Sequence, residues 1–231
     1  MPIRYLILDA GGVMVHPAHF MDWNVPADYK KILGKYADDI PSQAWAEAVR
    51  AECEIIREDI AIDGTDAEFA RKKEFYTKVA SRMGWKLTKS RITALAWDLT
   101  WNPARYIWYD DVLPALGRIH EKYPIGVLSD AMPSFRGIAE ARPEAEFFDA
   151  LTISTEVGAC KPDAKMYQTV CCALGAEPDQ CLFIDDRECN LRGAIKYGMH
   201  AAQMLRDGGP GWDGAIVRNF EGIMKLLDTS Y

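Results

Sequence analysis

The sequence lacks a long hydrophobic run and an excess of basic charge, and both absences exclude whole classes of protein. No apolar stretch approaches the roughly 20 residues that a helix needs to span a bilayer. The formal net charge of -7 argues against a nucleic-acid partner, because phosphate backbones are bound by basic surfaces. The first residues run straight into Asp9 without the pattern of a signal peptide. We therefore expect a cytoplasmic protein with no membrane partner and no nucleic-acid partner.

The cysteines lack the paired spacing of a metal site, such as two Cys-x-x-Cys units. In a reducing compartment they are expected to remain small buried hydrophobic residues. Cys160 precedes Lys161, and a neighbouring cation can lower the pKa of a thiol, although we expect no reactive role for it. The six are Cys53, Cys160, Cys171, Cys172, Cys181 and Cys189.

What the chain does have is a hydrophobic content of 49% over 231 residues, enough for a substantial core. Short apolar runs alternate with amphipathic segments, which predicts right-handed crossovers and a parallel sheet. We therefore predict an α/β fold, with a Rossmann-like parallel sheet core flanked by helices. The expected strands are 3–9, 125–128, 150–154, 181–184 and 201–205, and the expected helices of this core are 112–122, 163–175, 191–197 and 219–228.

One long segment interrupts the alternation directly after the first strand. From about residue 26 to residue 99 the pattern is helical, with one helix from Pro41 to about Glu58 and another from Thr65 to Gly84. We predict an inserted all-helical cap at residues 15–100, between core segments 1–14 and 101–231. Most of its tryptophans are expected to pack between helices, while Phe20 and Trp23 are the best placed to meet a substrate.

Polar residues stand at or near the exits of the predicted strands. In an open parallel sheet the carboxyl ends of the strands border the ligand crevice. Each residue alone also fits a turn, a helix cap or a solvated surface position, but their shared placement indicates one pocket. Two glycines allow the backbone to approach an ion or a phosphate closely. The residues are Asp9, Gly11, Gly12, Ser129, Asp130, Lys161, Asp185 and Asp186.

These residue types together indicate phosphoryl transfer. A carboxylate such as Asp9 can attack phosphorus and form an aspartyl-phosphate, which divides one difficult step into two. Adjacent carboxylates at Asp185 and Asp186 repel each other unless a hard cation lies between them, and Mg²⁺ suits an all-oxygen site. Lys161 offers positive charge and Ser129 a hydroxyl donor to the phosphoryl oxygens.

The sequence resembles the haloacid dehalogenase-like hydrolase superfamily. The likeness is to the branch with a helical cap, which includes the N-terminal phosphatase domain of soluble epoxide hydrolases. It rests on the segments Leu6-Ile7-Leu8-Asp9-Ala10-Gly11-Gly12-Val13, Val127-Leu128-Ser129-Asp130, Cys160-Lys161-Pro162-Asp163 and Phe183-Ile184-Asp185-Asp186-Arg187-Glu188-Cys189-Asn190.

The resemblance implies a role for each matching position. Asp9 would be the nucleophile and a metal ligand, Gly11 would offer its carbonyl to Mg²⁺, and Asp186 would be the main metal ligand. Asp185 would help to hold the metal or its water, and Asn190 would orient the site. Ser129, Asp130, Lys161, Gly11 and Gly12 would form the substrate-binding cradle, with Lys161 also counted as catalytic.

The chain departs from this family at Gly11, where phosphatases usually carry a second aspartate that handles protons. Loss of a general acid typically costs about 10²–10⁴-fold in rate. A good leaving group, as in an acyl, anomeric or aryl phosphate, needs no such help. Alternatively, His16 or His19 could stand in, although either histidine also fits an ordinary loop position.

The predicted function is a Mg²⁺-dependent phosphatase of a small phosphorylated metabolite, working as a monomer or a homodimer. A catalytically weak protein that binds a phosphometabolite or an interaction partner is the alternative from another class. A carbon–halogen hydrolase is a third reading, because halide needs no proton from position 11, but the Asp185 and Asp186 pair disfavours it.

Overall fold

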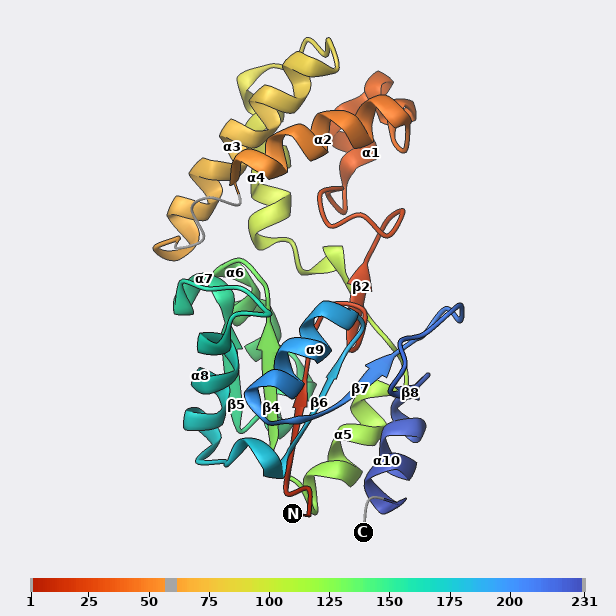
Figure 1. Ribbon diagram of the computed structural model, residues 1–231. Coiled ribbons are helices and arrows are strands. Elements are labelled where there is room, and N and C mark those ends of the chain that lie inside the picture. The colour runs from red at the N-terminus through yellow and green to blue at the C-terminus, as the bar shows by residue number, and fades with distance from the viewer. Residues whose placement is uncertain (1, 57–61, 230–231) are drawn as a thin grey trace. The chain divides into compact units, whose positions relative to one another are not determined.

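The computed structural model describes residues 2–56 and 62–229, and its contacts divide the chain into two compact units. Unit 1 comprises Met1–His16, Trp108–Ala131 and Phe135–Tyr231. Unit 2 comprises Pro17–Ile107 and Met132–Ser134. Figure 1 shows the strands of the main sheet in the first unit and the helices α1 to α4 in the second. Unit 2 overlaps the predicted insertion at residues 15–100, and its role as a cap stays a prediction.

A parallel sheet forms the centre of unit 1, as the alternating pattern predicted. Its strand order is β5-β4-β1-β6-β7-β8, and every recorded pairing in it is parallel. The strands are β1 (Tyr5–Leu8), β4 (Ile125–Ser129), β5 (Ala150–Ile153), β6 (Cys181–Asp185), β7 (His200–Met204) and β8 (Ala215–Val217).

Helices cover the sheet because its central strands are apolar on both faces. Leu6, Ile7 and Leu8 of β1 are fully buried, and successive side chains of a strand point to opposite faces. Ile7 belongs to a core cluster with residues of α8 (Ala164–Leu174) and α9 (Glu188–Tyr197). The other helices of the chain's second half are α5 (Val112–His120), α6 (Ser134–Glu140), α7 (Ser154–Val157) and α10 (Phe220–Thr229).

Unit 2 is built around helices whose apolar faces bury several tryptophans. Trp45 and Trp85 are buried and stacked, with ring centroids 6.0 Å apart, and their indole nitrogens donate to Asp22 and Asp39 respectively. Trp97, in contrast, is about half exposed. The helices are α1 (Tyr29–Leu33), α2 (Gln43–Ile56), α3 (Gly64–Arg82) and α4 (Lys89–Trp101), and the short 3-10 helices of the chain are Gly34–Asp39, Pro103–Arg105, Pro143–Phe147 and Pro178–Gln180.

Two short strands carry the chain between the units and were not predicted. β2 (Val15–Pro17) pairs with β3 (Tyr106–Trp108) in a separate two-stranded sheet. Each strand has only three residues, too few for a period-two pattern to be recognisable in the sequence. The sequence predicts a helix from Pro41 to about Glu58, and the predicted end lies outside the described residues.

The expectation for the cysteines is only partly correct. Cys171 and Cys181 are buried, but Cys172 and Cys189 are exposed, because they lie on the outer faces of α8 and α9. Burial and the charge of Asp130 raise the pKa of the Cys160 thiol despite its neighbour Lys161. None of the described helices combines the length and the apolar content needed to cross a membrane.

Candidate active site

The candidate site lies where three neighbouring strands of unit 1 end. β1 pairs with β4 on one side and with β6 on the other, so that Leu8 lies opposite Val127 and Ile184. Asp9 follows β1 directly, Ser129 is the last residue of β4, and Asp185 is the last residue of β6. The sheet register therefore brings together residues that are far apart in the sequence.

Lys161 joins these strand ends through a single ammonium group. Its Nζ lies 2.7 Å from Oδ1 of Asp9 and 2.8 Å from Oδ2 of Asp185, and it donates to the carbonyl of Leu128 at 3.0 Å. An ammonium has three N–H donors, so these acceptors account for all of them. The lysine side chain is 1% exposed. A further acceptor can therefore receive a hydrogen bond from this ammonium only in place of one of the three.

The segment around Lys161 is held in position by its neighbours. Oδ1 of Asp130 accepts the Lys161 amide at 3.0 Å, and Tyr167 donates its hydroxyl to the Asn190 carbonyl. Gly193 on α9 leaves no room for a side chain, since a Cβ there would lie 2.5 Å from Cβ of Pro162. The missing side chain allows α9 to pack directly against the Lys161-Pro162 turn.

The two oxygens of Asp9 have different surroundings. Oδ1 accepts the Ala10 amide at 2.7 Å and contacts the Lys161 ammonium. Oδ2 accepts no hydrogen bond from the described part of the chain. The carboxylate is thus oriented through one oxygen while the other keeps its lone pairs for a substrate or a cation.

Asp185 is saturated by donors from the protein. Its Oδ1 accepts from the Arg187 amide and from Nδ2 of Asn190, and its Oδ2 accepts from Lys161 and from the same Asn190 nitrogen. The residue is fully buried. Asp185 therefore orients Lys161 and Asn190, and a direct bond from it to a metal stays a prediction.

Asp186 is exposed and lies against the turn that follows Asp9. A Cβ added to Gly12 would lie 2.5 Å from Oδ2 of Asp186, and Gly12 has a φ of +73°. Only glycine adopts that backbone conformation routinely and leaves space for the carboxylate. Gly11, in contrast, is not among the glycines with positive φ.

The donor set fits Mg²⁺. Carboxylate oxygens of Asp9, Asp185 and Asp186 lie within 4.8 Å of one another, although those of Asp185 already accept hydrogen bonds from the protein. Oxygen-only ligands suit a hard divalent cation. Three carboxylates around one ammonium also leave excess negative charge, which a divalent cation would neutralise.

The pKa values of these groups reflect crowding and burial. Burial raises the pKa of Asp9 well above its usual value, and the charges of Asp185 and Asp186 act in the same direction against Lys161. Asp186 is exposed as a residue, but desolvation of its carboxyl group by the surrounding protein, together with the charge of Asp185, raises its pKa to about 6. Burial alone would lower the pKa of Lys161, but Asp9, Asp185 and Asp130 raise it, so the lysine stays protonated.

The other predicted residues lie in different places. Ser129 is buried beside Leu128, whose carbonyl Lys161 contacts, while Asp130 is exposed and holds the Lys161 amide. His16 is half-buried in β2, with its ring 4.9 Å from that of Tyr109 in unit 1.

Three residues named for the inserted segment belong to unit 2. His19 lies 2.9 Å from the Ala27 carbonyl through Nε2, which therefore donates to it. Phe20 is about half exposed, and Trp23 is half-buried with its ring 5.5 Å from that of Tyr106. Their contact with a substrate stays a prediction.

Two residues of the second half of the chain were missed by sequence reasoning. Gln203 of β7 donates to the Asp186 carbonyl at 2.9 Å, and Arg206 donates to the Val13 carbonyl from two nitrogens. Neither belongs to a recognisable motif, because both act on backbone groups that lie far away in the sequence. Only the fold reveals them.

The chain belongs to the haloacid dehalogenase-like hydrolases, since the model of that family matches residues 3–198. Asp9, Ser129, Lys161, Asp185 and Asp186 all lie inside the matched range, whereas Gln203 and Arg206 lie outside it. No protein in the comparison with curated proteins matches the chain.

Several solved structures share the fold. The L-2-haloacid dehalogenase from Xanthobacter autotrophicus is 15% identical, with a TM-score of 0.71 over 99% of this chain and 100% of that chain. A HAD phosphatase from Thermococcus onnurineus is 18% identical, with a TM-score of 0.65 over 97% and 98%. The putative HAD-hydrolase YfnB from Bacillus subtilis, solved with bound magnesium, is 12% identical, with a TM-score of 0.70 over 99% and 100%. At these identities the likeness concerns the fold and leaves the reaction open.

Proposed function

We propose that this hydrolase is a Mg²⁺-dependent phosphatase that acts on a small phosphorylated metabolite through an aspartyl-phosphate on Asp9. The observation that carries the proposal is the arrangement of Asp9 and its neighbours. One oxygen of Asp9 is held by Lys161 and the Ala10 amide, the other accepts no hydrogen bond within the described residues, and further carboxylates lie beside it.

In the first step Oδ2 of Asp9 attacks phosphorus, and the bond from phosphorus to the leaving oxygen breaks. Asp9 and Asp186 would hold Mg²⁺ together with the Gly11 carbonyl, and the cation would neutralise charge on the phosphoryl oxygens. Ser129 ends β4, and the Lys161 ammonium contacts the carbonyl of the preceding residue, Leu128, so both side chains can donate to the same oxygens. In the second step water attacks phosphorus, which releases inorganic phosphate and regenerates the Asp9 carboxylate.

Position 11 limits the range of substrates. Gly11 has no side chain to protonate the leaving oxygen, so the reaction depends on that oxygen leaving as an anion or on another proton donor. We therefore propose acyl, anomeric or aryl phosphates as the preferred substrate class. A cytoplasmic location also remains part of the proposal.

Gly11 also favours a second candidate, a protein that binds a phosphometabolite with little turnover. Carbon–halogen hydrolysis is the remaining enzyme reading, in line with the printed titles of several neighbours. The excess of carboxylates around Lys161 disfavours it, because a reaction that expels halide has no use for a cation beside the nucleophile.

A substrate panel with matched conditions separates the three functions. It contains acyl, anomeric, aryl and alkyl phosphates and 2-chloropropionate, each assayed with Mg²⁺ or EDTA, with wild type and Asp9→Asn. We expect phosphate release that needs both Mg²⁺ and Asp9. Turnover that survives chelation or survives in Asp9→Asn contradicts the mechanism. Tight binding of a phosphate ester without turnover supports the binding protein, and chloride release in EDTA supports the halide hydrolase.

A further inference from the structure

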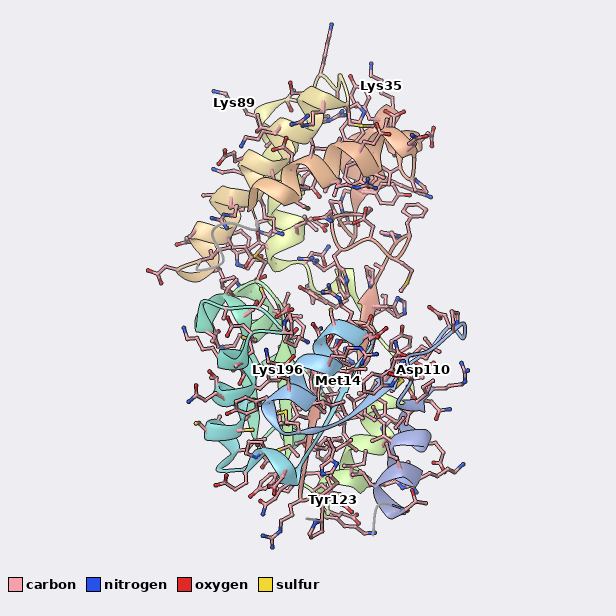
Figure 2. The ribbon with its side chains drawn as sticks, in the orientation of Figure 1. Met14, Lys35, Lys89, Asp110, Tyr123 and Lys196 are labelled. Carbon is pink, nitrogen blue, oxygen red and sulfur yellow. The ribbon has the colours of Figure 1, made fainter. Side chains whose placement is uncertain are left out.

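The turn that follows Asp9 is tightly closed on itself. The amides of Met14 and Val15 both donate to the Ala10 carbonyl, at 2.8 and 2.9 Å, and the Gly12 amide donates to the Val15 carbonyl at 2.8 Å. Met14, labelled in Figure 2, marks the turn and is fully buried. These bonds fix the shape of the turn, but they do not fix where it lies against Asp186.

Arg206 ties this turn to the rest of unit 1. The residue follows β7, and its Nε and Nη2 donate to the Val13 carbonyl at 3.0 and 2.6 Å. Its Nη1 donates to Oδ1 of Asp111 at 2.9 Å, and the guanidinium lies over the Tyr109 ring, 3.7 Å from its centroid. The side chain is 10% exposed. The Val13 carbonyl, the Asp111 carboxylate and the Tyr109 ring therefore fix the orientation of the guanidinium group.

Two of the three donors of Arg206 meet at one peptide group, that of the Val13 carbonyl. Two donors on a single carbonyl restrict rotation of the peptide plane between Val13 and Met14. The next carbonyl, that of Met14, accepts the Tyr109 amide at 3.0 Å, and Tyr109 itself lies under the guanidinium. Two consecutive carbonyls of the turn are thus fixed from outside it.

Strand β7 also holds the opposite side of the contact between the turn and Asp186. Gln203 donates from Nε2 to the Asp186 carbonyl at 2.9 Å, and its Oε1 accepts the Trp212 amide at 2.9 Å. Gly12 lies against the Asp186 carboxylate with no space for a Cβ. The β7 region therefore positions both partners of that contact.

We propose that Arg206 is a positioning residue for this site, which holds the Gly11-Gly12 turn against Asp186. In that place the Gly11 carbonyl and the two carboxylates, Asp9 and Asp186, can meet one cation. The consequence for catalysis rests on the proposed function, whereas the hold on the turn does not. Arg206 touches neither substrate nor reacting atoms in this scheme and acts through the Val13 carbonyl.

The test compares Arg206→Gln and Arg206→Lys with Arg192→Gln. Arg192 is an exposed arginine of unit 1 that pairs with Glu188 and Asp213, so its variant controls for the loss of an ion-paired arginine. The first measurement is hydrogen exchange at the amides of residues 12–15. We expect Arg206→Gln to speed this exchange about tenfold, while Arg206→Lys restores part of the protection because an ammonium can still donate to Val13. Arg192→Gln leaves it unchanged.

The second measurement is the Mg²⁺ dissociation constant, determined by calorimetry on the full chain. We expect Arg206→Gln to weaken Mg²⁺ binding about 10–100-fold, the range seen for groups that orient metal ligands without touching the metal. Arg206→Lys lies between it and wild type. With an ester substrate, kcat falls more than KM rises, because the turn matters most when charge develops.

Three outcomes overturn the proposal: unchanged exchange at residues 12–15, unchanged Mg²⁺ affinity despite faster exchange, or no rescue by lysine. If Arg206→Gln does not fold, Arg206→Lys against wild type decides the same points. Failure of the proposed function is distinguishable, because wild type itself would then neither bind Mg²⁺ nor hydrolyse a phosphate ester. The catalytic half of the proposal falls with it, and hydrogen exchange still decides whether Arg206 holds the turn.

Discussion

Lys161 Nζ lies 2.7 Å from Oδ1 of Asp9, and both side chains are almost completely buried. A buried ion pair of this kind fixes geometry more than it adds stability, because both charges lose their hydration. The pair orients Asp9 through one oxygen and leaves the other without a hydrogen bond from the described residues.

Removing the ammonium leaves the buried carboxylates of Asp9 and Asp185 without the cation that pairs with both. Breaking a buried pair in this way typically destabilises a protein by about 3–5 kcal/mol, so we expect Lys161→Met to lower the free energy of unfolding by that amount. Urea denaturation measures it. Lys196→Met, at an exposed lysine of α9 labelled in Figure 2, is the control and is expected to stay within about 0.5 kcal/mol of wild type. Equal losses in the two variants contradict the account.

A methyl group at Gly12 tests the close approach to Asp186. Gly12→Ala combines a strained φ of +73° with a Cβ 2.5 Å from the carboxylate, whereas Gly175→Ala has a φ of +63° with nothing within 4 Å. Both variants carry the conformational strain of roughly 1–2 kcal/mol, but only Gly12→Ala should also weaken Mg²⁺ binding, by displacing Asp186. Calorimetric titration with Mg²⁺ compares them. Identical affinities in the two variants argue against Asp186 as a ligand.

An aspartate at position 11 tests whether the missing general acid limits the rate. We expect Gly11→Asp to accelerate hydrolysis of alkyl phosphates by about 10²–10⁴-fold and to change acyl phosphates little. Plots of kcat against leaving-group pKa measure this, with Gly11→Asn as the isosteric control.

If wild type already hydrolyses alkyl phosphates as fast as acyl phosphates, another residue supplies the proton. His16→Gln and His19→Gln then identify it by loss of the acidic or basic limb of the pH–rate profile. His16 belongs to the unit that contains Asp9, whereas His19 already donates to Ala27. We therefore expect the larger effect in His16→Gln.

Lys72 predicts a pH dependence of stability in unit 2. Burial and the charge of Arg105 lower its pKa to about 8 in the folded chain, against about 10.4 in an unfolded one. Between these values the unfolded chain binds more protons, so the contribution of Lys72 to the free energy of unfolding rises with pH. Below pH 8 Lys72 is charged in both the folded and the unfolded chain, so it lowers the free energy of unfolding by a constant amount.

Substitution of Lys72 by methionine removes this pH-dependent contribution to the free energy of unfolding. We expect Lys72→Met to stabilise the protein most at pH 7 and to lose the advantage as pH rises from 8 to 10, in urea denaturation at each pH. Lys89, which points outward from unit 2 in Figure 2, provides the control variant Lys89→Met. An advantage of Lys72→Met that does not change with pH refutes the explanation.

The sheet was predictable because its central strands are buried on both faces. Runs such as Tyr5–Leu8 and Cys181–Asp185 are nearly continuous in apolar residues, and polar residues mark their ends. The strands β2 and β3 were not predictable, since three residues carry no periodic signal. The register that places Asp9 between Ser129 and Asp185 follows from strand order, which sequence alone leaves open.

The candidate site was predictable in its residue types but not in its contacts. The sequence motifs contain Asp9, Lys161 and Asp185. Only the fold shows that all three N–H groups of Lys161 have acceptors within the protein. Arg206 and Gln203 donate to backbone carbonyls, and no sequence pattern predicts such contacts.

The central claim is that Asp9 carries the phosphoryl group during turnover. The most direct measurement is to mix the protein with Mg²⁺ and an acyl phosphate, quench in acid within the first turnover, and locate any phosphoryl group by peptide mass spectrometry. The account predicts one phosphoryl group on the peptide that contains Asp9, and none in Asp9→Asn or in EDTA. Phosphate release without modification of that peptide, or modification at another residue, would contradict it.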